Sequence, residues 1–278
     1  HAHCNLAEHA AAIPAEKLQF MFSTFPWFSI EDSSHVQTVL FPGKEIRTLR
    51  FPNAFGGIDF VGASNYLVAQ SPATDRVALY GLPDDIQYTV DQLRTRKYTA
   101  LKMYHQYLTP PATKIYEYFR PEILATAQDL DIPIILHLPK MITQALGQIE
   151  QLVTDFPRLR ITLAHLGLPH LPVPGLSQAY DRVASFENVF MDTAMIPSAE
   201  VVQLALESFG SDRIMYGSDE PLNLVRSAVY RNPELGERLA TEYPYHWVDP
   251  AEHKQYGHLA KGAIHTQWKA LDAIRVAL

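Results

Sequence analysis

Five potential metal ligands occupy regular positions in this chain. His1 and His3 form a His-x-His pair, while His137, His165 and Asp219 each close a short apolar run. Apolar runs of about four to six residues bounded by turn signals are typical of buried parallel strands, and α/β barrels carry their chemistry at the carboxyl ends of such strands. Imidazole and carboxylate groups are ligands of Zn²⁺ and related ions. The series therefore predicts a metal enzyme.

Each of these residues also has a simpler interpretation. A His-x-His pair alone is weak evidence, His137 or His165 could be a buried histidine satisfied by the backbone, and Asp219 could cap the turn that follows it. The joint pattern is stronger because independent placements agree at successive predicted strand ends. We therefore favour the metal site over the separate structural roles.

Composition narrows the class of protein. The 278 residues are 47% hydrophobic, which is ample for the core of an α/β barrel of about 250 residues. The formal charge is −7 and basic residues do not cluster, so nucleic acid is an unexpected partner. No apolar stretch reaches the roughly 18 residues of a membrane span. The single cysteine, Cys4, excludes an internal disulfide and is typical of the reducing cytoplasm.

The elements that must position these residues alternate along the chain. Strand-like and helix-like segments follow one another from about residue 75, which indicates parallel strands joined by right-handed crossovers. Strands are predicted at 46–51, 76–80, 99–103, 132–137, 159–165, 189–192 and 213–217. Helices are predicted at 65–70, 84–96, 114–129, 142–156, 176–185, 198–209 and 261–278. This pattern predicts an α/β fold, a (β/α)₈ TIM barrel formed as one domain by residues 1–278.

Two segments interrupt the alternation. Residues 18–43 are rich in aromatic side chains without clear periodicity, and we expect an inserted loop and short-helix layer over the barrel mouth. Residues 233–257 are expected to form a second insertion after the last strand. Both lie where inserted loops shape a substrate site on the carboxyl-terminal face of a barrel.

Four segments carry a resemblance to a known family: 100–104, 132–138, 156–167 and 209–221, the last with Gly-Ser-Asp followed two residues later by proline. Over about residues 46–278 the chain resembles the amidohydrolase superfamily, in the amidohydrolase-2 branch typified by aminocarboxymuconate-semialdehyde decarboxylase. The resemblance implies that His1, His3, His137 and Asp219 bind one divalent metal, with Zn²⁺ the expected ion. It places His165 beside the metal as a catalytic histidine or weak ligand.

The chain departs from the family pattern at two places. In the family the His-x-His motif ends the first barrel strand, so we expect that the numbering begins inside a longer chain and that this strand is absent from it. The second departure concerns Lys102. In some relatives the lysine at this position is carboxylated and bridges two metals. Here we expect an ordinary amine that can pair with a substrate carboxylate.

The expected activity is hydrolysis of a C–N amide or C–O ester or lactone bond in a small molecule. A bound metal lowers the pKa of water toward about 7. Asp219 would accept the proton of the attacking water and deliver it to the leaving group, and His165 would polarise the substrate carbonyl. Asp192 is expected to accept a hydrogen bond from a metal-bound histidine rather than to bind the metal itself.

Two alternatives remain open. The first is non-oxidative decarboxylation of a small aromatic or unsaturated carboxylic acid, which a cation that clamps a second carboxylate would favour. Lys102 and Arg50 are the predicted substrate contacts, with Lys140 and Arg47 as further candidates. The second is a non-catalytic barrel that binds a metal or assembles with a partner, although His165 and Asp219 together argue against it. Assembly into a homo-oligomer is open on this evidence.

Overall fold

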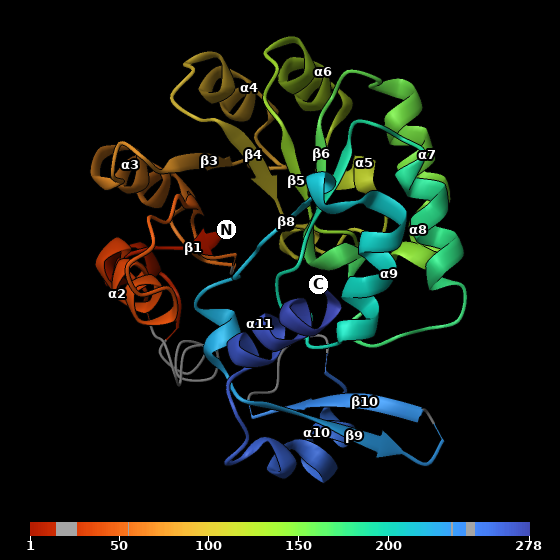
Figure 1. The fold of residues 1–278 in the computed structure, drawn as a ribbon. Helices are drawn as coiled ribbons and strands as arrows, with labels where there is room; N and C mark the ends of the chain where they lie inside the picture. The colour runs from red at the N-terminus through yellow and green to blue at the C-terminus, as the bar shows by residue number, and fades with distance from the viewer. Residues whose placement is uncertain (15–26, 55, 235, 243–247) are drawn as a thin grey trace.

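Eight parallel strands form the centre of the computed structural model, which describes residues 1–14, 27–54, 56–234, 236–242 and 248–278 (Figure 1). Each strand neighbours the next in sequence order. They are β1 (Ala2–His3), β2 (Leu49–Phe51), β3 (Arg76–Tyr80), β4 (Ala100–Met103), β5 (Ile134–Leu136), β6 (Ile161–Leu163), β7 (Val189–Asp192) and β8 (Ile214–Met215). The residues of the His-x-His pair thus contribute a short first strand, and the expectation that the numbering begins inside a longer chain stays a prediction.

The sheet closes on itself between its last and first strands. Ala2 forms a parallel bridge with Glu220, just beyond β8. The N–H of His3 donates to the carbonyl of Glu220 at 2.7 Å, and the N–H of Asp219 donates to the carbonyl of His1 at 3.1 Å. The fold is therefore the predicted (β/α)₈ TIM barrel.

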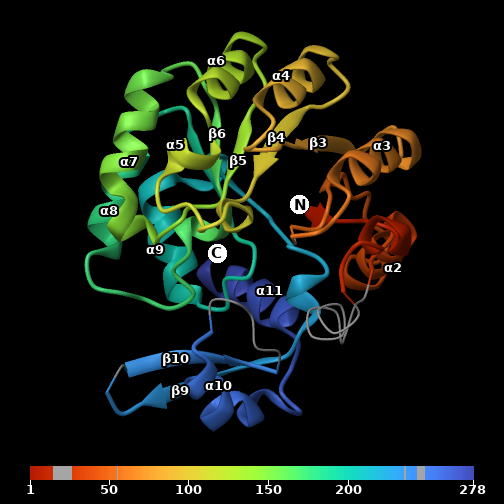
Figure 2. The same ribbon diagram turned by 180° about the vertical axis from the view of Figure 1, so that it is seen from behind.

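Helices surround the strands in an outer ring, as Figures 1 and 2 show from opposite sides. At least one helix follows each strand before the next begins, as right-handed crossovers require. They are α2 (Ile30–Leu40), α3 (Phe60–Gln70), α4 (Ile86–Arg94), α5 (Ile115–Tyr118), α6 (Pro121–Asp129), α7 (Ile142–Asp155), α8 (Leu176–Ala184), α9 (Ala199–Phe209) and α11 (Thr266–Ala277). Within the described ranges, none of the helices has the length and apolar character required to cross a membrane.

Some predicted helix boundaries were wrong. The predicted helix 114–129 is two helices, α5 and α6, because Pro121 lacks an N–H and forces Arg120 into an extended conformation with ψ 143°. The predicted closing helix 261–278 begins only at Thr266. Gly262 lies before it with φ +80°, a conformation that a helix does not accommodate.

The segment 18–43, predicted as a loop and short-helix layer over the barrel mouth, contains a helix of the outer ring. Residues 15–26 lie outside the described ranges, but residues 30–40 form a regular helix, α2, that takes the first place in the outer ring. Ser29 begins it with a capping box to Asp32. Beyond Ile30 at its first position, its buried face carries Ser33 and Gln37. Because that face is polar, the helix shows little of the apolar periodicity by which a sequence is recognised as helical.

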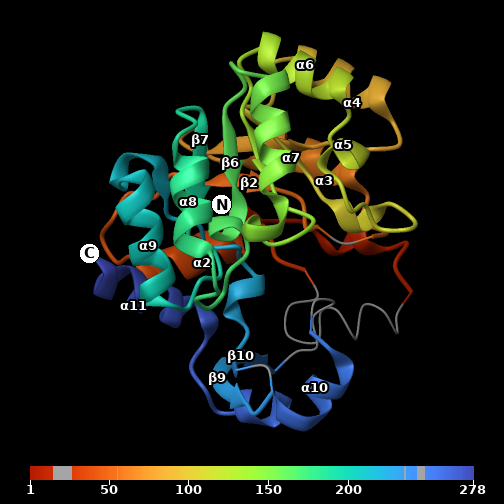
Figure 3. The same cartoon turned by 90° about the vertical axis from the view of Figure 1, so that its right-hand side faces the viewer.

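The second insertion follows β8, as predicted. It contains a two-stranded antiparallel hairpin and a helix: β9 (Ser227–Asn232), β10 (Gly236–Thr241) and α10 (Pro250–Tyr256). In Figure 3 this unit projects below the barrel. Arg238 and Glu252 join the hairpin to α10 at 3.0 Å, and the rings of Tyr230 and Tyr256 stack at 4.2 Å.

The strand register divides the side chains between two layers. Large aliphatic side chains fill the space between the sheet and the helices. A smaller cluster fills the barrel interior and consists of Phe51, Ala78, Ala100, Ile135 and Ala164. Side chains two residues apart in a strand share a face, so residues that follow these by two positions also point inward.

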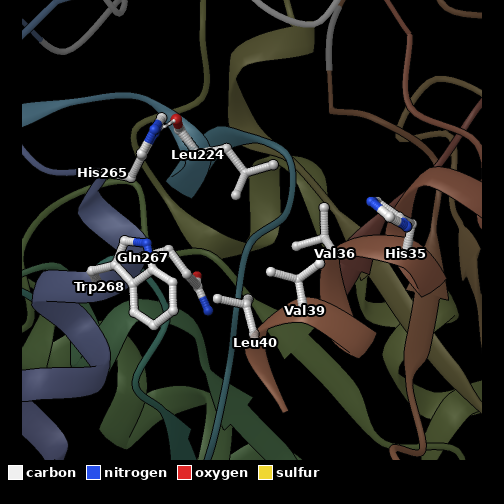
Figure 4. A pocket seen from close by; sticks show the side chains of 8 residues that line it. All are labelled: His35, Val36, Val39, Leu40, Leu224, His265, Gln267 and Trp268. Atoms are coloured by element: carbon white, nitrogen blue, oxygen red, sulfur yellow. Dashed lines mark hydrogen bonds between the residues drawn. The ribbon is translucent and has the colours of Figure 1, made fainter. Parts of the chain in front are cut away.

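One pocket lies away from the barrel interior, where α2 and α11 meet. It has a volume of about 250 Å³ and an almost entirely apolar lining. Figure 4 shows its walls: His35, Val36, Val39 and Leu40 from α2, Leu224, and His265, Gln267 and Trp268 at the start of α11. No carboxylate lines it, so it lacks the chemistry of the ligand series.

Candidate metal centre

Barrel closure brings His1, His3 and Asp219 together. His3 pairs in register with Phe51, whose ring belongs to the inner cluster, so His1 and His3 both point into the barrel. Asp219 follows β8 on the other side of the closure, with its backbone in the left-handed region at φ 60°. Residues more than two hundred positions apart thus share one end of the barrel.

The potential ligand atoms of these three residues form a compact group. Nε2 of His1 lies 3.1 Å and Nε2 of His3 lies 2.9 Å from Oδ1 of Asp219. All three atoms are within 4.8 Å of one another, and within the described part of the chain this is the group that could hold a metal ion. The side chains are 3–7% exposed.

The hydrogen bonding of His3 fits a bound cation. Its Nδ1 lies 3.1 Å from the carbonyl oxygen of Pro52, which only accepts, so Nδ1 carries the hydrogen and Nε2 of the neutral ring presents a lone pair. Burial lowers the pKa of His3 more than Asp219 raises it, which keeps the ring neutral at pH 7. A lone pair then faces a carboxylate oxygen at 2.9 Å. A metal ion would satisfy both acceptors.

His1 lies between two carboxylates. Its Nδ1 is 3.1 Å from Oδ2 of Asp192, and its Nε2 faces Asp219. Burial alone would lower the pKa of His1, but the two carboxylates raise it to about 9. Burial would likewise raise the pKa of Asp192, but His1 brings it down to about 2. Asp192 therefore accepts a hydrogen bond from a histidine of the group, as expected from the sequence.

Asp192 also positions His165. Its Oδ1 accepts the backbone N–H groups of His165 at 3.0 Å and Ala194 at 3.1 Å. Nδ1 of His165 lies 3.0 Å from the carbonyl oxygen of Ala194, so Nδ1 donates and Nε2 presents a lone pair. Burial lowers the pKa of His165, which keeps the ring neutral at pH 7. The neutral ring is a proton acceptor, not the donor that carbonyl polarisation would require.

His137 lies beside this group rather than within it. Its ring is 5.1 Å from the ring of His165 and packs edge-on against Tyr104 at 4.7 Å. Its Nδ1 faces the carbonyl oxygen of Leu138 at 3.0 Å. Burial, together with the nearby positive charge of Lys102, holds the pKa of His137 well below its usual value. Its role as a fourth ligand stays a prediction.

Lys102 lies in the barrel interior, two residues beyond Ala100 on β4. It is 2% exposed, and its Nζ is 5.5 Å from the centre of the Phe51 ring. Burial lowers the pKa of Lys102 to about 8, while Asp219 and Asp192 oppose that effect. Lys102, which the sequence predicted as a substrate contact, therefore lies near both Asp192 and Asp219.

Arg50 is not at the centre, contrary to the prediction that it contacts substrate. It alternates with Phe51 on β2 and so points outward, where its Nε pairs with Oδ2 of Asp75 at 2.7 Å. The other proposed clamps, Arg47 and Lys140, are exposed. We therefore leave Arg50 out of the proposed substrate site.

Three residues of the inner wall were missed in the sequence. The Phe51 ring stacks on His1 at 5.2 Å and packs edge-on against His3 at 4.5 Å. Tyr104 and His105 flank His137, with the ring of His105 at 5.3 Å. The signal available was their position at or just after the ends of predicted strands, but aromatic residues are so common in cores that this signal alone is weak.

The fold and this donor set define a barrel of the amidohydrolase kind. The sequence model of the amidohydrolase family, the amidohydrolase-2 branch, matches residues 104–260. The match includes His137, His165 and Asp219 and begins after the His-x-His pair. The chain belongs to the amidohydrolase-2 family and is an enzyme of that superfamily. A comparison with curated proteins finds no match.

Solved structures share this fold. An amidohydrolase from Burkholderia multivorans with bound HEPES has 16% identity and a TM-score of 0.60, covering 81% of this chain and 84% of that chain. A probable 2-pyrone-4,6-dicarboxylic acid hydrolase from Acinetobacter baumannii with bound citric acid has 14% identity and a TM-score of 0.58, covering 100% of this chain and 90% of that chain. A 2,6-dihydroxybenzoate decarboxylase from Rhizobium has 17% identity and a TM-score of 0.53, covering 80% of this chain and 86% of that chain. The Burkholderia amidohydrolase is also known with bound zinc.

Proposed function

We propose that residues 1–278 form a single metal-dependent hydrolase domain that cleaves a C–N amide or C–O ester or lactone bond of a small molecule. His1, His3 and Asp219 would hold one divalent ion, with His137 as a further ligand and Zn²⁺ as the ion. A zinc-bound amidohydrolase of the same fold supports this ion. When bound, the ion supplies Lewis acidity and lowers the pKa of water toward about 7.

The observation that favours hydrolysis is the set of proton acceptors beside the proposed ligands. Asp219 meets His1 and His3 through Oδ1, which leaves Oδ2 as the oxygen to accept a proton. Nε2 of His165 presents a lone pair because Nδ1 donates to Ala194. Hydrolysis begins with removal of a proton from water, and these two groups serve that step. The protonated carboxyl or imidazole then returns the proton to the leaving group.

Decarboxylation is the second candidate, and one observation favours it. Lys102 is a buried cation close to the proposed ligands, as a clamp for a carboxylate would be. However, decarboxylation requires a proton on a substrate carbon, and Nε2 of His165, whose Nδ1 donates to Ala194, would first have to take that proton from water. We therefore keep hydrolysis as the principal proposal.

Isotopes distinguish the two reactions. The zinc-loaded protein should be screened with small amides, lactones and aromatic acids in H₂¹⁸O and in D₂O. A hydrolase incorporates one solvent oxygen into its product. Release of CO₂ with one solvent deuterium on carbon, without ¹⁸O uptake, would show that decarboxylation is correct instead.

A matched pair of variants tests the role of Asp219. Asp219→Asn should lower turnover by about a hundredfold or more, because a carboxamide cannot accept the proton. Asp212→Asn, at an exposed position, should behave as wild type. Circular dichroism checks the fold, and elemental analysis of the purified protein checks metal content. Turnover of Asp219→Asn within about threefold of wild type would refute the assigned role.

A cytoplasmic location, inferred from the lone Cys4, and assembly into a homo-oligomer stay predictions.

A further inference from the structure

Glu220 is a buried carboxylate on the outer side of the barrel wall. It is 1% exposed, and its Oε2 accepts hydrogen bonds from Oγ of Ser33 at 2.9 Å and Nε2 of Gln37 at 3.5 Å, both on α2. Elsewhere large aliphatic side chains fill the layer between sheet and helices. Because burial of a carboxylate costs free energy, an apolar side chain would serve packing better here. Glu220 therefore calls for a reason beyond packing.

The hydrogen bonds around Glu220 run in one direction. Oγ1 of Thr48 donates to Oε1 of Gln37 at 3.1 Å, which leaves Nε2 of Gln37 to donate to Oγ of Ser33 at 3.1 Å. The Ser33 hydroxyl then donates to Glu220. All four side chains are buried. The series of donors ends on a carboxylate, so this position requires a side chain that accepts hydrogen bonds.

The residue before Glu220 is the proposed ligand Asp219, whose backbone is strained. Its φ of 60° lies in the left-handed region, which a residue other than glycine keeps only where its surroundings hold it. Main-chain hydrogen bonds join Asp219 to His1 and Glu220 to His3. The side chains then diverge, Asp219 into the barrel and Glu220 toward α2. Movement of Glu220 would therefore turn the carboxylate of Asp219.

The contact with α2 also crosses the barrel closure. Helix α2 follows β1, the strand that provides His1 and His3, whereas Glu220 follows β8. We propose that Glu220 is a positioning residue of the metal centre: its carboxylate, held by Ser33 of α2, fixes the orientation of Asp219 toward the two histidines. The inference rests on the proposed metal centre and adds a residue that lies outside the barrel interior.

Cobalt(II) tests this role because its visible absorption bands depend on coordination geometry. The purified protein is titrated with Co²⁺, and zinc affinity is measured by competition with a chromophoric chelator. Glu220→Met has a similar size but accepts no hydrogen bond from Ser33, so it should weaken zinc binding about tenfold or more and alter the cobalt bands. Glu220→Gln keeps an acceptor oxygen and should retain the wild-type bands, with zinc affinity within about threefold of wild type.

Two further variants separate positioning from stability. Ser33→Ala removes the same hydrogen bond from the side of α2 and should also weaken zinc binding. Added to Glu220→Met it should have no further effect, since the bond is already absent. Thr89→Val is the matched control, because Thr89 is a fully buried residue of α4 whose Oγ1 accepts the N–H of Leu82 at 2.9 Å. It should lower the melting temperature and leave the cobalt bands unchanged.

The possible results have distinct meanings. Wild-type bands and zinc affinity in Glu220→Met would overturn the proposal, whatever its melting temperature. An equal loss in Glu220→Gln would overturn it as well, because the charge rather than the hydrogen bond would then matter. If Glu220→Met does not fold, unchanged zinc affinity in Ser33→Ala overturns the proposal. Absence of metal binding in wild type would instead refute the metal centre itself, and this inference with it.

Discussion

Zinc binding to the proposed centre should release a proton from His1 and should therefore strengthen with pH. Both ring nitrogens of His1 face carboxylate oxygens at 3.1 Å, from Asp192 and Asp219. Burial opposes protonation, but the carboxylates raise the pKa of His1 to about 9. A metal binds only an imidazole nitrogen with a free lone pair, so it must displace this proton. His3, whose pKa is lowered, is already neutral at pH 7 and contributes none.

The size of the effect follows from the pKa. At pH 7, about two units below a pKa of about 9, removing the proton costs roughly 2.7 kcal/mol, and the apparent affinity is about a hundredfold below its plateau. The logarithm of the affinity should rise by about one for each pH unit between 7 and 9. The metal-free fold has the opposite trend. Its raised His1 pKa contributes stability that is fully present below about 6.5 and is lost as pH rises through about 9.

The assay is competition with a chromophoric chelator from pH 6.5 to 9.5, corrected for protonation of the chelator. Asp192→Asn keeps an oxygen that accepts the Nδ1 hydrogen of His1 but removes one charge, so the pKa of His1 should decrease and the slope should flatten. Asp212→Asn, exposed and distant, is the control. A pH-independent affinity in wild type, or an unchanged slope in Asp192→Asn, would refute this reasoning.

Three further predictions concern stability and reactivity. Arg50→Met leaves Asp75 buried without its partner and should lower the free energy of unfolding by about 3–5 kcal/mol in urea titrations, without weakening zinc binding; a loss below about 1 kcal/mol would contradict the ion-pair argument. Gly167 has φ +77°, and Gly167→Ala puts a Cβ 2.7 Å from a side-chain carbon of α7, so this variant should lower the free energy of unfolding by about 1–3 kcal/mol. Gly147 lies in the middle of α7 with open space around it, so Gly147→Ala should raise the free energy of unfolding by about 0.5–1 kcal/mol. Cys4 is fully buried, which raises the pKa of its thiol to about 11, so iodoacetamide at pH 8 should alkylate it only as fast as the protein opens; rapid labelling of the folded protein would show that it is accessible.

Much of the fold could be predicted because its signals are local. Strands β2 to β8 lie within the predicted segments, and β3 and β7 have the predicted bounds. Their apolar runs are short and are bounded by prolines, glycines and charged residues. Family resemblance supplied the closed barrel, which the alternation of strands and helices also indicated. The ends of elements were less certain, as the break of the predicted helix 114–129 before Pro121 shows.

Helix α2 shows where local signals fail. It buries Ser33 and Gln37, which make hydrogen bonds with Glu220 at 2.9 and 3.5 Å. Polar residues on a buried face are recognised only when their partner is known. That partner lies more than 180 residues away in the sequence, next to the barrel closure.

The sequence by itself determined which residues end the strands, and therefore that His1, His3 and Asp219 share one end of a barrel. Only the tertiary structure decided which side chains face each other across it. Arg50 and Phe51 are adjacent, and the register of β2 turns Phe51 to the interior and Arg50 to Asp75. A one-residue shift would reverse both. Register is set by pairing between distant segments, and no local pattern in the sequence carries that information.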